Sequence, residues 1–216
     1  MKNKEIQATD WDKYYSKPFK ATSFTRKITG NVLINLIKKN IPEFSGLKIV
    51  EFGGANSCFF ELIQNEIKPL EYHIIDINDL GLRKLEKRAA NYRNTFLYND
   101  NVLNLENTKN INADLVFSIG LIEHFTQENT QRAIKSHFDI LKPGGLAVMS
   151  FPTPTFLYNA TRRLSEICKM WIFHDERPIK HDEVISNSVN YAELLDSKTI
   201  WLIFLTQGII AARKKY

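Results

Sequence analysis

Cysteine is scarce in this sequence: its 216 residues include two, Cys58 and Cys168. Two cysteines so far apart in the chain exclude a disulfide framework and favour a reducing, cytoplasmic setting. Long apolar runs are also missing, since the longest, 200–205, is far shorter than the roughly 20 residues of a membrane-spanning helix. The N-terminal residues lack the apolar stretch of a secretory signal. We therefore expect a soluble, cytoplasmic protein without a membrane span.

The excess of positive over negative charge is small. The chain carries 29 basic and 24 acidic residues, a formal net charge of +5, which would suit an anionic partner. The basic residues are scattered, however, and the densest groups are short: 83–88 has the spacing of a solvated helix face, and 213–215 resembles a tail. Because a nucleic-acid-binding face needs clustered charge, nucleic acid is disfavoured as the partner. No feature of the sequence indicates an oligomeric state.

What the sequence does contain is a regular alternation of short apolar segments with segments whose apolar residues recur at helical spacing. Strands are expected at 47–52, 72–75, 95–98, 113–118 and 146–151, and helices at 25–40, 58–67, 80–91 and 129–141. Continuous apolar strands that alternate with helices predict a parallel sheet covered on both faces. After the last of these strands, 155–186 is expected to be an irregular helical insertion. Two closing strands, 189–195 and 207–212, are expected to form an antiparallel edge hairpin.

The first predicted strand ends in a glutamate and a turn of small residues. Glu51 is followed by Gly53, Gly54, Ala55 and Ser57. Small residues let the backbone approach a ligand, and the helix after them points its N-terminus at that ligand. A glutamate in a buried strand needs a partner; it would repel a diphosphate but attract a sulfonium or an ammonium. The negative charge of Glu51 therefore favours S-adenosylmethionine, which carries a sulfonium, over NAD, which carries a diphosphate. The G-x-G-x-x-G spacing of NAD sites is also not met from Gly53.

Acidic and amide residues also follow the second and third predicted strands. Asp76 ends the second strand, 25 residues after the glutamate, where an acid accepts hydrogen bonds from both hydroxyls of a ribose. The alternative is that Asp76 caps the next helix, but Asn78 or Asp79 fits that role better. Asp100 and Asn101 follow the third strand. There a carboxylate or an amide can receive an adenine amino group, and a plain loop role is equally open.

Four motifs occur in order along the chain. They are the turn Glu51-x-Gly53-x-Ala55-x-Ser57, the acidic strand end at Asp76, the segment 119–125 (Ile-Gly-Leu-Ile-Glu-His-Phe) and the segment 141–145 (Leu-Lys-Pro-Gly-Gly). Together they resemble the class I S-adenosylmethionine-dependent methyltransferases, in the large small-molecule branch often labelled type 11 or type 23. The likeness covers roughly residues 45–152, and 206–214 is similar to the last strand of that branch. Each motif alone is weak evidence for this family, whereas four motifs in the right order and spacing are strong evidence.

The resemblance implies an α/β, Rossmann-like fold: a seven-stranded, mostly parallel sheet with helices on both faces and an antiparallel last strand. It also implies S-adenosylmethionine as the cofactor. The residues expected to bind it are Glu51 and Gly53 near the methionine portion, Asp76 at the ribose, Asp100 and Asn101 near adenine, and Ser118, Ile119 and Gly120 along the methionine tail. Gly54, Ala55 and Ile77 are further candidates for contact with the cofactor. Ala55 and Ser57 replace two glycines of the family pattern. Because both are small, we expect binding to survive.

On this interpretation residues 1–216 form a single methyltransferase domain. Its parts are an N-terminal arm or lid (1–24), a cofactor-binding core (25–152), a substrate-side insertion (153–188) and closing strands (189–216). Trp11, Tyr14 and Tyr15 in the arm are candidates for an aromatic lid over the cofactor, and Tyr14 and Tyr15 for contact with the substrate. Packing of these rings into the core is the alternative.

One histidine is a candidate catalytic residue. Methyl transfer from a sulfonium is an in-line displacement, which requires alignment and, when the acceptor is a hydroxyl, removal of a proton. His124 lies just past the fourth predicted strand, and the pKa of histidine suits a base. The alternative is that 123–125 is a structural turn in which His124 bonds to the backbone.

The insertion adds candidates for binding the acceptor. His174 and Arg177 lie in a polar stretch, 173–178, and loops carried by a rigid scaffold often hold functional residues. A surface salt-bridge cluster is the alternative. Because arginine forks match phosphate oxygens, Arg162, Arg163 and Arg177 suit a phosphate-bearing acceptor. No metal is predicted, since the histidines and acids show no tight ligand spacing.

We therefore predict methyl transfer to a small polar metabolite, first a hydroxyl of a nucleotide-linked or polysaccharide sugar. The segment 171–184 resembles methyltransferases that decorate bacterial surface polysaccharides. N-methylation of a small amine or amide is the alternative acceptor chemistry. An RNA methyltransferase would need a continuous basic groove with exposed aromatics, and a non-catalytic relative would bind the cofactor without an acceptor cavity.

Overall fold

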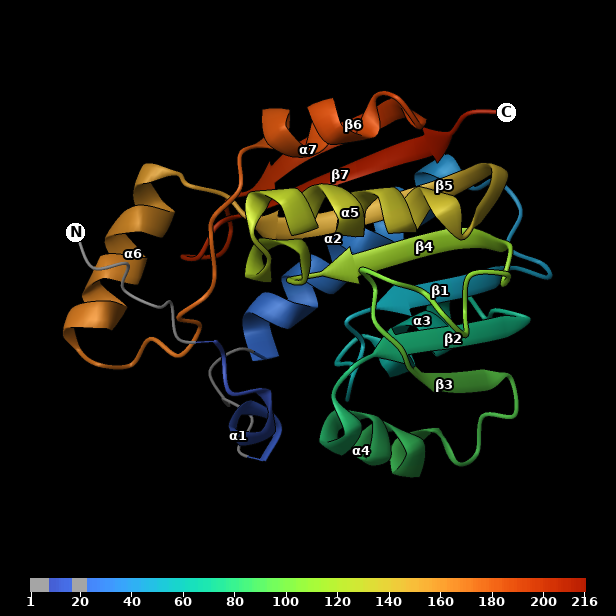
Figure 1. The fold of residues 1–216 in the computed structure, drawn as a ribbon, viewed down its shortest axis with the longest axis horizontal. Helices are drawn as coiled ribbons and strands as arrows, with labels where there is room; N and C mark the ends of the chain where they lie inside the picture. The colour runs from blue at the N-terminus through green and yellow to red at the C-terminus, as the bar shows by residue number, and fades with distance from the viewer. Residues whose placement is uncertain (1–7, 17–22) are drawn as a thin grey trace.

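A computed structural model describes residues 8–16 and 23–216 of the chain. Within these ranges seven strands form one sheet in the order β3-β2-β1-β4-β5-β7-β6, in which β7 alone runs antiparallel to the rest (Figure 1). The strands are β1 (Lys48–Phe52), β2 (Glu71–Asp76), β3 (Thr95–Asn99), β4 (Ala113–Ile119), β5 (Leu141–Pro152), β6 (Ala192–Ile200) and β7 (Gln207–Lys214). The expected seven-stranded, mostly parallel α/β sheet is confirmed.

Helices cover both faces of this sheet, as predicted. They are α1 (Trp11–Ser16), α2 (Ser23–Asn40), α3 (Phe60–Glu66), α4 (Asp79–Ala89), α5 (Gln127–Asp139), α6 (Phe156–Ile167) and α7 (His181–Ser188), with a 3₁₀ turn at Ile122–His124. Successive buried residues of a strand pack alternately against the helices on the two faces of the sheet. In β1, Ile49 packs in the cluster that includes α2, α3 and α4, whereas Val50 packs in the cluster that includes α5 and α7. Side chains of a strand point alternately to its two faces, so a strand covered on both sides is apolar throughout.

The parallel strands direct their carboxyl ends to one edge of the sheet. Phe52 of β1 pairs with Ile75 of β2 and with Ser118 of β4, so the segments that follow these three strands begin at the same level. Figure 1 shows α1 and α6 on the side toward which the arrows of β1 and β4 point. This carboxyl edge therefore gathers the predicted site residues from segments far apart in the sequence.

The two closing strands form the predicted antiparallel hairpin, and β7 lies inside the sheet between β5 and β6. Residues 209–212 of β7 are buried because neighbours flank the strand on both sides. The bounds differ from those expected. β6 begins only after α7 and extends to Ile200, which still pairs with Gln207. β5 begins at Leu141, which pairs with Ala113, so the Pro-Gly-Gly motif lies in the strand rather than closing a helix.

The N-terminal arm and the insertion are more regular than the sequence indicated. Asp10 caps α1, since its carboxylate accepts a hydrogen bond from the backbone N–H of Lys13 at 2.9 Å. Thr155 caps α6 in the same way through the N–H of Tyr158. The remainder of the predicted arm, 1–7 and 17–22, lies outside the described residues. In the part of the chain that the structure describes, every helix is too short or too polar to cross a bilayer.

Candidate functional site

Glu51 is a buried acid at the carboxyl edge of the sheet. Its side chain is 4% exposed; the hydroxyl of Tyr72 donates to Oε2 at 2.5 Å and that of Ser57 to Oε1 at 2.7 Å. Burial raises the pKa of Glu51 to about 7, although both hydrogen bonds act in the opposite direction. A carboxylate that is costly to ionise in isolation gains most from a nearby positive charge. The cationic ligand that the sequence predicts beside Glu51 would favour ionisation of this acid.

The turn after β1 brings the backbone close to this acid. Gly53 has a φ of +71°, a conformation that glycine adopts without strain. At Gly54 a Cβ atom would lie 2.8 Å from both Cδ of Glu51 and Cγ2 of Ile74, so no larger residue fits there without displacement. The N–H of Ala55 points to the neighbouring strand end and donates to Asp76 at 2.9 Å. The small residues of the motif are thus explained by close packing around Glu51.

Asp76 joins the first turn to the second. Its two carboxylate oxygens accept hydrogen bonds from the N–H groups of Ala55 and Asn78, and burial raises its pKa. Asn78, not Asp76, caps α4, because its Oδ1 accepts from the N–H of Gly81 at 2.7 Å. Of the two capping candidates that the sequence offers, Asn78 and Asp79, the structure shows Asn78. Ile77 between them is 62% exposed, so its side chain is available to a ligand.

Asp100 organises the loop after β3. Oδ1 accepts hydrogen bonds from the N–H groups of Asn101 and Glu106, and Oδ2 from the N–H of Asn107 and the hydroxyl of Thr108. Burial by itself would raise the pKa of Asp100, but these hydrogen bonds hold it below its usual value. The side-chain oxygen of Asn101 likewise accepts from within the loop. Both side chains have the loop role that the sequence left open beside contact with adenine.

The end of β4 is held by a buried histidine that sequence reasoning missed. The hydroxyl of Ser118 lies 2.9 Å from Nε2 of His137 on α5, and both residues are fully buried. Burial lowers the pKa of His137 to about 4, so the ring is neutral at physiological pH. Gly120 has a φ of +72°, and its N–H donates to the carbonyl of Ser150. These contacts fix the 118–120 backbone next to the turn after β1.

His124 is oriented by a carboxylate from the insertion. Its Nδ1 lies 2.9 Å from Oδ1 of Asp175, so the predicted alternative of a bond to the backbone does not describe this side chain. Burial by itself would lower the pKa of His124, but the hydrogen bond to Asp175 and the charges around it raise it. Thr9 in turn donates its N–H and its hydroxyl to Asp175. Sequence reasoning did not single out Asp175, because nothing local links it to a histidine near β4.

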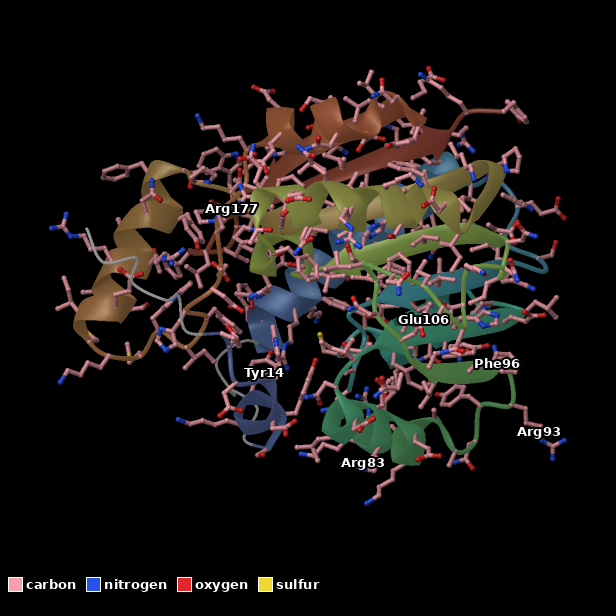
Figure 2. The ribbon with its side chains drawn as sticks, in the orientation of Figure 1. Tyr14, Arg83, Arg93, Phe96, Glu106 and Arg177 are labelled. Carbon is pink, nitrogen blue, oxygen red and sulfur yellow. The ribbon has the colours of Figure 1, made fainter. Side chains whose placement is uncertain are left out.

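Helix α1 lies across the carboxyl edge. The ring of Trp11 meets that of His124 edge-on at 4.9 Å between centroids, and Asn78 donates to Asp12 at 2.7 Å. Burial raises the pKa of Tyr15, which lies close enough to Asp76 and Glu51 to be affected by their charges. Figure 2 shows Tyr14 on the same helix, where its hydroxyl accepts from Arg26. The predicted lid residues thus span the distance from the Glu51 turn to His124.

The two predicted acceptor contacts of the insertion differ in their surroundings. The side chain of His174 is exposed. Arg177 forms a two-pronged ion pair with Glu183, at 2.9 and 2.8 Å, and its backbone N–H donates to the carbonyl of Glu123. Figure 2 shows Arg177 beside the end of α5. Arg177 therefore forms the salt bridge that the sequence analysis gave as the alternative to acceptor binding. His174 is open to solvent.

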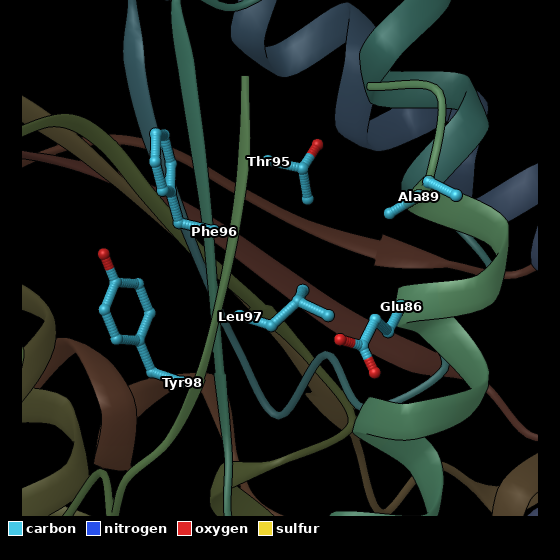
Figure 3. Close-up of a pocket in the computed structure, with 7 residues that line it drawn as sticks. Glu86, Ala89, Thr95, Phe96, Leu97 and Tyr98 are labelled. Carbon is cyan, nitrogen blue, oxygen red and sulfur yellow. The ribbon is translucent and has the colours of Figure 1, made fainter. Parts of the chain in front are cut away.

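A surface pocket lies elsewhere, between α4 and the edge strand β3 (Figure 3). It is lined by Glu86, Ala89, Ala90, Thr95, Phe96, Leu97 and Tyr98. None of these residues belongs to the predicted site. The carboxyl edge, where the acids and small residues converge, is the better candidate for chemistry.

The comparisons with known proteins agree with this geometry. Residues 50–147, from the middle of β1 into β5, match a family model described as a methyltransferase domain. This match agrees with the class I S-adenosylmethionine-dependent methyltransferases that the sequence motifs resemble. No curated protein sequence matches the chain significantly.

Solved structures resemble the chain over nearly its whole length. The N-methyltransferase NodS from Bradyrhizobium japonicum WM9, in complex with S-adenosyl-L-homocysteine, is 13% identical with a TM-score of 0.66, and the match covers 94% of this chain and 91% of that one. Magnesium protoporphyrin IX methyltransferase (ChlM) from Synechocystis PCC 6803 is 15% identical with a TM-score of 0.69, covering 95% and 93%. An O-methyltransferase family protein from Burkholderia thailandensis is 13% identical with a TM-score of 0.61, covering 88% and 59%. Such distant likeness establishes the fold and leaves the acceptor open.

Proposed function

We propose that this protein transfers the methyl group of S-adenosylmethionine to a hydroxyl of a small polar metabolite, first a nucleotide-linked or polysaccharide sugar. The observation that carries the proposal is the hydrogen bond between His124 and Asp175 at the carboxyl edge. A hydroxyl must lose its proton as it takes the methyl group, whereas the sulfonium leaves as a neutral thioether without an acid. Because Asp175 engages Nδ1, Nε2 is the nitrogen left to accept that proton.

The cofactor is proposed to lie along the edge from β4 to β3. Glu51 would face the sulfonium, whose charge offsets the cost of ionising a buried acid. Asp76 would receive the ribose hydroxyls, since each of its oxygens accepts one backbone N–H and has a second lone pair. Adenine would lie by the loop that Asp100 holds rigid, and the methionine tail by 118–120.

The acceptor is proposed to bind under α1 and the insertion. Tyr14, Tyr15 and His174 would contact it, on the side of the cofactor where His124 lies. Arg177 could hold a phosphate only by sharing its guanidinium with Glu183. The scarcity of cysteine supports a cytoplasmic setting for the reaction.

N-methylation of a small amine is the second candidate. The acids around His124, namely Glu123, Asp175 and Glu176, raise its pKa and would also attract an ammonium group. An amine acceptor is most reactive when neutral, so such a cluster would bind it better than it would activate it. This reasoning ranks the hydroxyl acceptor first.

Calorimetry with S-adenosylmethionine and S-adenosyl-L-homocysteine tests the cofactor site. Asp76→Ala is expected to weaken both ligands at least tenfold, about 1.4 kcal/mol, because two hydrogen bonds to a charged group are lost. Asp79→Ala, an acid three positions further on, is the matched control and is expected to bind as the wild type does. Absence of binding in the wild type would contradict the cofactor geometry.

The acceptor is tested by release of S-adenosyl-L-homocysteine in the presence of nucleotide sugars, small amines or RNA. Turnover with nucleotide sugars is the expected result. Turnover with amines alone would favour the second candidate, and turnover with RNA alone would reverse the ranking. Binding of the cofactor with no turnover on any of these classes would indicate a non-catalytic relative.

A further inference from the structure

Three potential metal ligands converge beside the proposed acceptor site. They are Glu123 and His124, in the 3₁₀ turn after β4, and Glu176, in the segment between α6 and α7. One nitrogen of His124 and one carboxylate oxygen of each glutamate all lie within 4.8 Å of one another. No metal was expected from the sequence, because Glu176 is far from the turn in the chain and metal motifs are recognised by local spacing.

Glu123 is a buried carboxylate that lacks a full set of partners. Its side chain is 2% exposed, and no hydrogen-bond donor within the described ranges reaches its Oε2. Buried polar atoms without partners are rare in folded proteins because removing them from water is costly. An unpartnered oxygen on a buried carboxylate that converges with two other potential ligands indicates that a group belongs there.

Hydrogen bonds from neighbouring residues orient the other two potential ligands, His124 and Glu176. Asp175 engages Nδ1 of His124 at 2.9 Å, which leaves Nε2 for a ligand. A carboxylate behind a histidine is the usual support of a metal-binding imidazole. Tyr158 donates its hydroxyl to Oε1 of Glu176, and Arg162 donates to the backbone carbonyl of Glu176 at 2.9 Å. The second oxygen of Glu176 remains for a ligand.

We propose that Glu123, His124 and Glu176 bind a divalent metal ion, of the Mn²⁺ or Mg²⁺ class, that ligates the hydroxyl oxygens of the acceptor. The two carboxylates suit this class of cation, which prefers oxygen ligands. Three protein ligands also leave coordination positions open for substrate oxygens. Vicinal hydroxyls of a sugar can fill two such positions, so this inference rests on the proposed function and specifies how the acceptor is held.

The cation changes the part that His124 plays. Nε2 is the nitrogen that would accept the proton of the acceptor hydroxyl, and in the metal-bound protein it is a ligand instead. His124 then positions the cation, and the proton of the hydroxyl, which the metal makes more acidic, would pass to water. Without the metal, Nε2 itself accepts that proton. The rings of Trp11 and Phe173 pack against that of His124, with centroids 4.9 and 5.8 Å away.

Titration of the EDTA-treated full-length protein with MnCl₂, followed by the electron paramagnetic resonance signal of free Mn²⁺, tests the site. One Mn²⁺ per chain is expected. Glu123→Gln and Glu176→Gln keep the side-chain shapes, and each is expected to weaken Mn²⁺ binding at least tenfold. Asp182→Asn removes the same charge at the start of α7, away from the cluster, and is expected to bind Mn²⁺ as the wild type does. At a hundredfold excess over its Kd, Mn²⁺ is expected to raise the Tm of the wild type by about 5–10 °C.

Two results would overturn the metal site. One is the absence of stoichiometric Mn²⁺ binding to the wild type, including the case in which methylammonium binds there instead. The other is Mn²⁺ binding that is unchanged in both glutamine variants. S-adenosylmethionine affinity, measured on the same samples without metal, reports that each variant is folded. It also separates the two proposals, because a metal-free protein that still binds the cofactor leaves the proposed function standing.

Discussion

The hydroxyl of Tyr72 lies 2.5 Å from Oε2 of Glu51, inside the sheet and one strand away. In the parallel register Glu51 stands opposite Ile74, so Tyr72, two residues earlier, points to the same face. With Ser57 on the other oxygen, the carboxyl group is held in one orientation before any ligand arrives. Such preorganisation would let the acid meet a cationic ligand without rearranging.

The stability of the free protein is expected to fall as pH rises from about 4.5 to 7. Over this interval the folded protein keeps a proton on Glu51, whose pKa is about 7, while the unfolded chain has released it. Because the folded state binds more protons, the free energy of unfolding decreases with pH, by up to about 3 kcal/mol from this one group. Urea unfolding at pH 5 and pH 8 measures the effect. Glu51→Gln is expected to lose less unfolding free energy between these two pH values than the wild type. Equal losses in the two proteins would contradict a raised pKa of Glu51.

Binding of S-adenosylmethionine near pH 7 is expected to release protons. The sulfonium favours the ionised form of Glu51, which is about half protonated at that pH, so the release approaches about half a proton per site. Calorimetry in two buffers with different heats of ionisation counts these protons. S-adenosyl-L-homocysteine, which lacks the sulfonium charge, is expected to release fewer. An equal count for both ligands would place Glu51 away from the sulfonium.

Gly54→Ala is expected to reduce cofactor affinity and to destabilise the fold by about 1–3 kcal/mol, because the new Cβ would press on Glu51 and Ile74. Gly46→Ala is the control. Gly46 has a φ of +76° with nothing within 4 Å of its Cβ position, so alanine there adds backbone strain of about 1–2 kcal/mol and no clash. Thermal unfolding and calorimetry distinguish the two variants. A Gly54→Ala protein with unchanged affinity would show that the ligand lies elsewhere.

His124→Ala is expected to lower kcat by about a hundredfold or more while S-adenosylmethionine affinity stays the same. Asp175→Asn keeps the imidazole but removes the charge behind it, so a smaller loss of kcat is expected. The control is His181→Gln, a histidine bonded to Ser197 and Thr199 on β6. Turnover on an acceptor found by the nucleotide-sugar screen is the measurement. Unchanged turnover of His124→Ala at saturating substrate would exclude a part for His124 in the chemical step.

The strand, turn and acid at each carboxyl end were predictable because their signals are local. The apolar run into Glu51, the small residues after it and the acid at Asp76 all stand within a few positions of one another. Parallel pairing then places them together without further information. The cap at Asn78 was predictable for the same reason, since a capping side chain acts on the first turn of its own helix.

The rest of the site depends on contacts between distant segments, which local patterns do not report. The packing of Trp11 on His124 joins the N-terminal arm to the turn after β4, and Asp175 reaches the same histidine from the insertion. Asp100 shows that a local signal can also fit two different roles. Its position after β3 suits both a ligand and a loop, and only its four hydrogen-bond donors reveal how the side chain is used here.

The position of β7 between β5 and β6 sets the order in which the sheet can be completed. β6 is synthesised before β7, yet β7 is the strand with which β6 forms its hydrogen bonds. Until 207–214 has been synthesised, β5 and β6 both present unsatisfied backbone groups that another chain could pair with. A nascent or truncated chain lacking this segment is therefore expected to recruit chaperones or aggregate, even though the Glu51 turn and Asp76 have long since emerged.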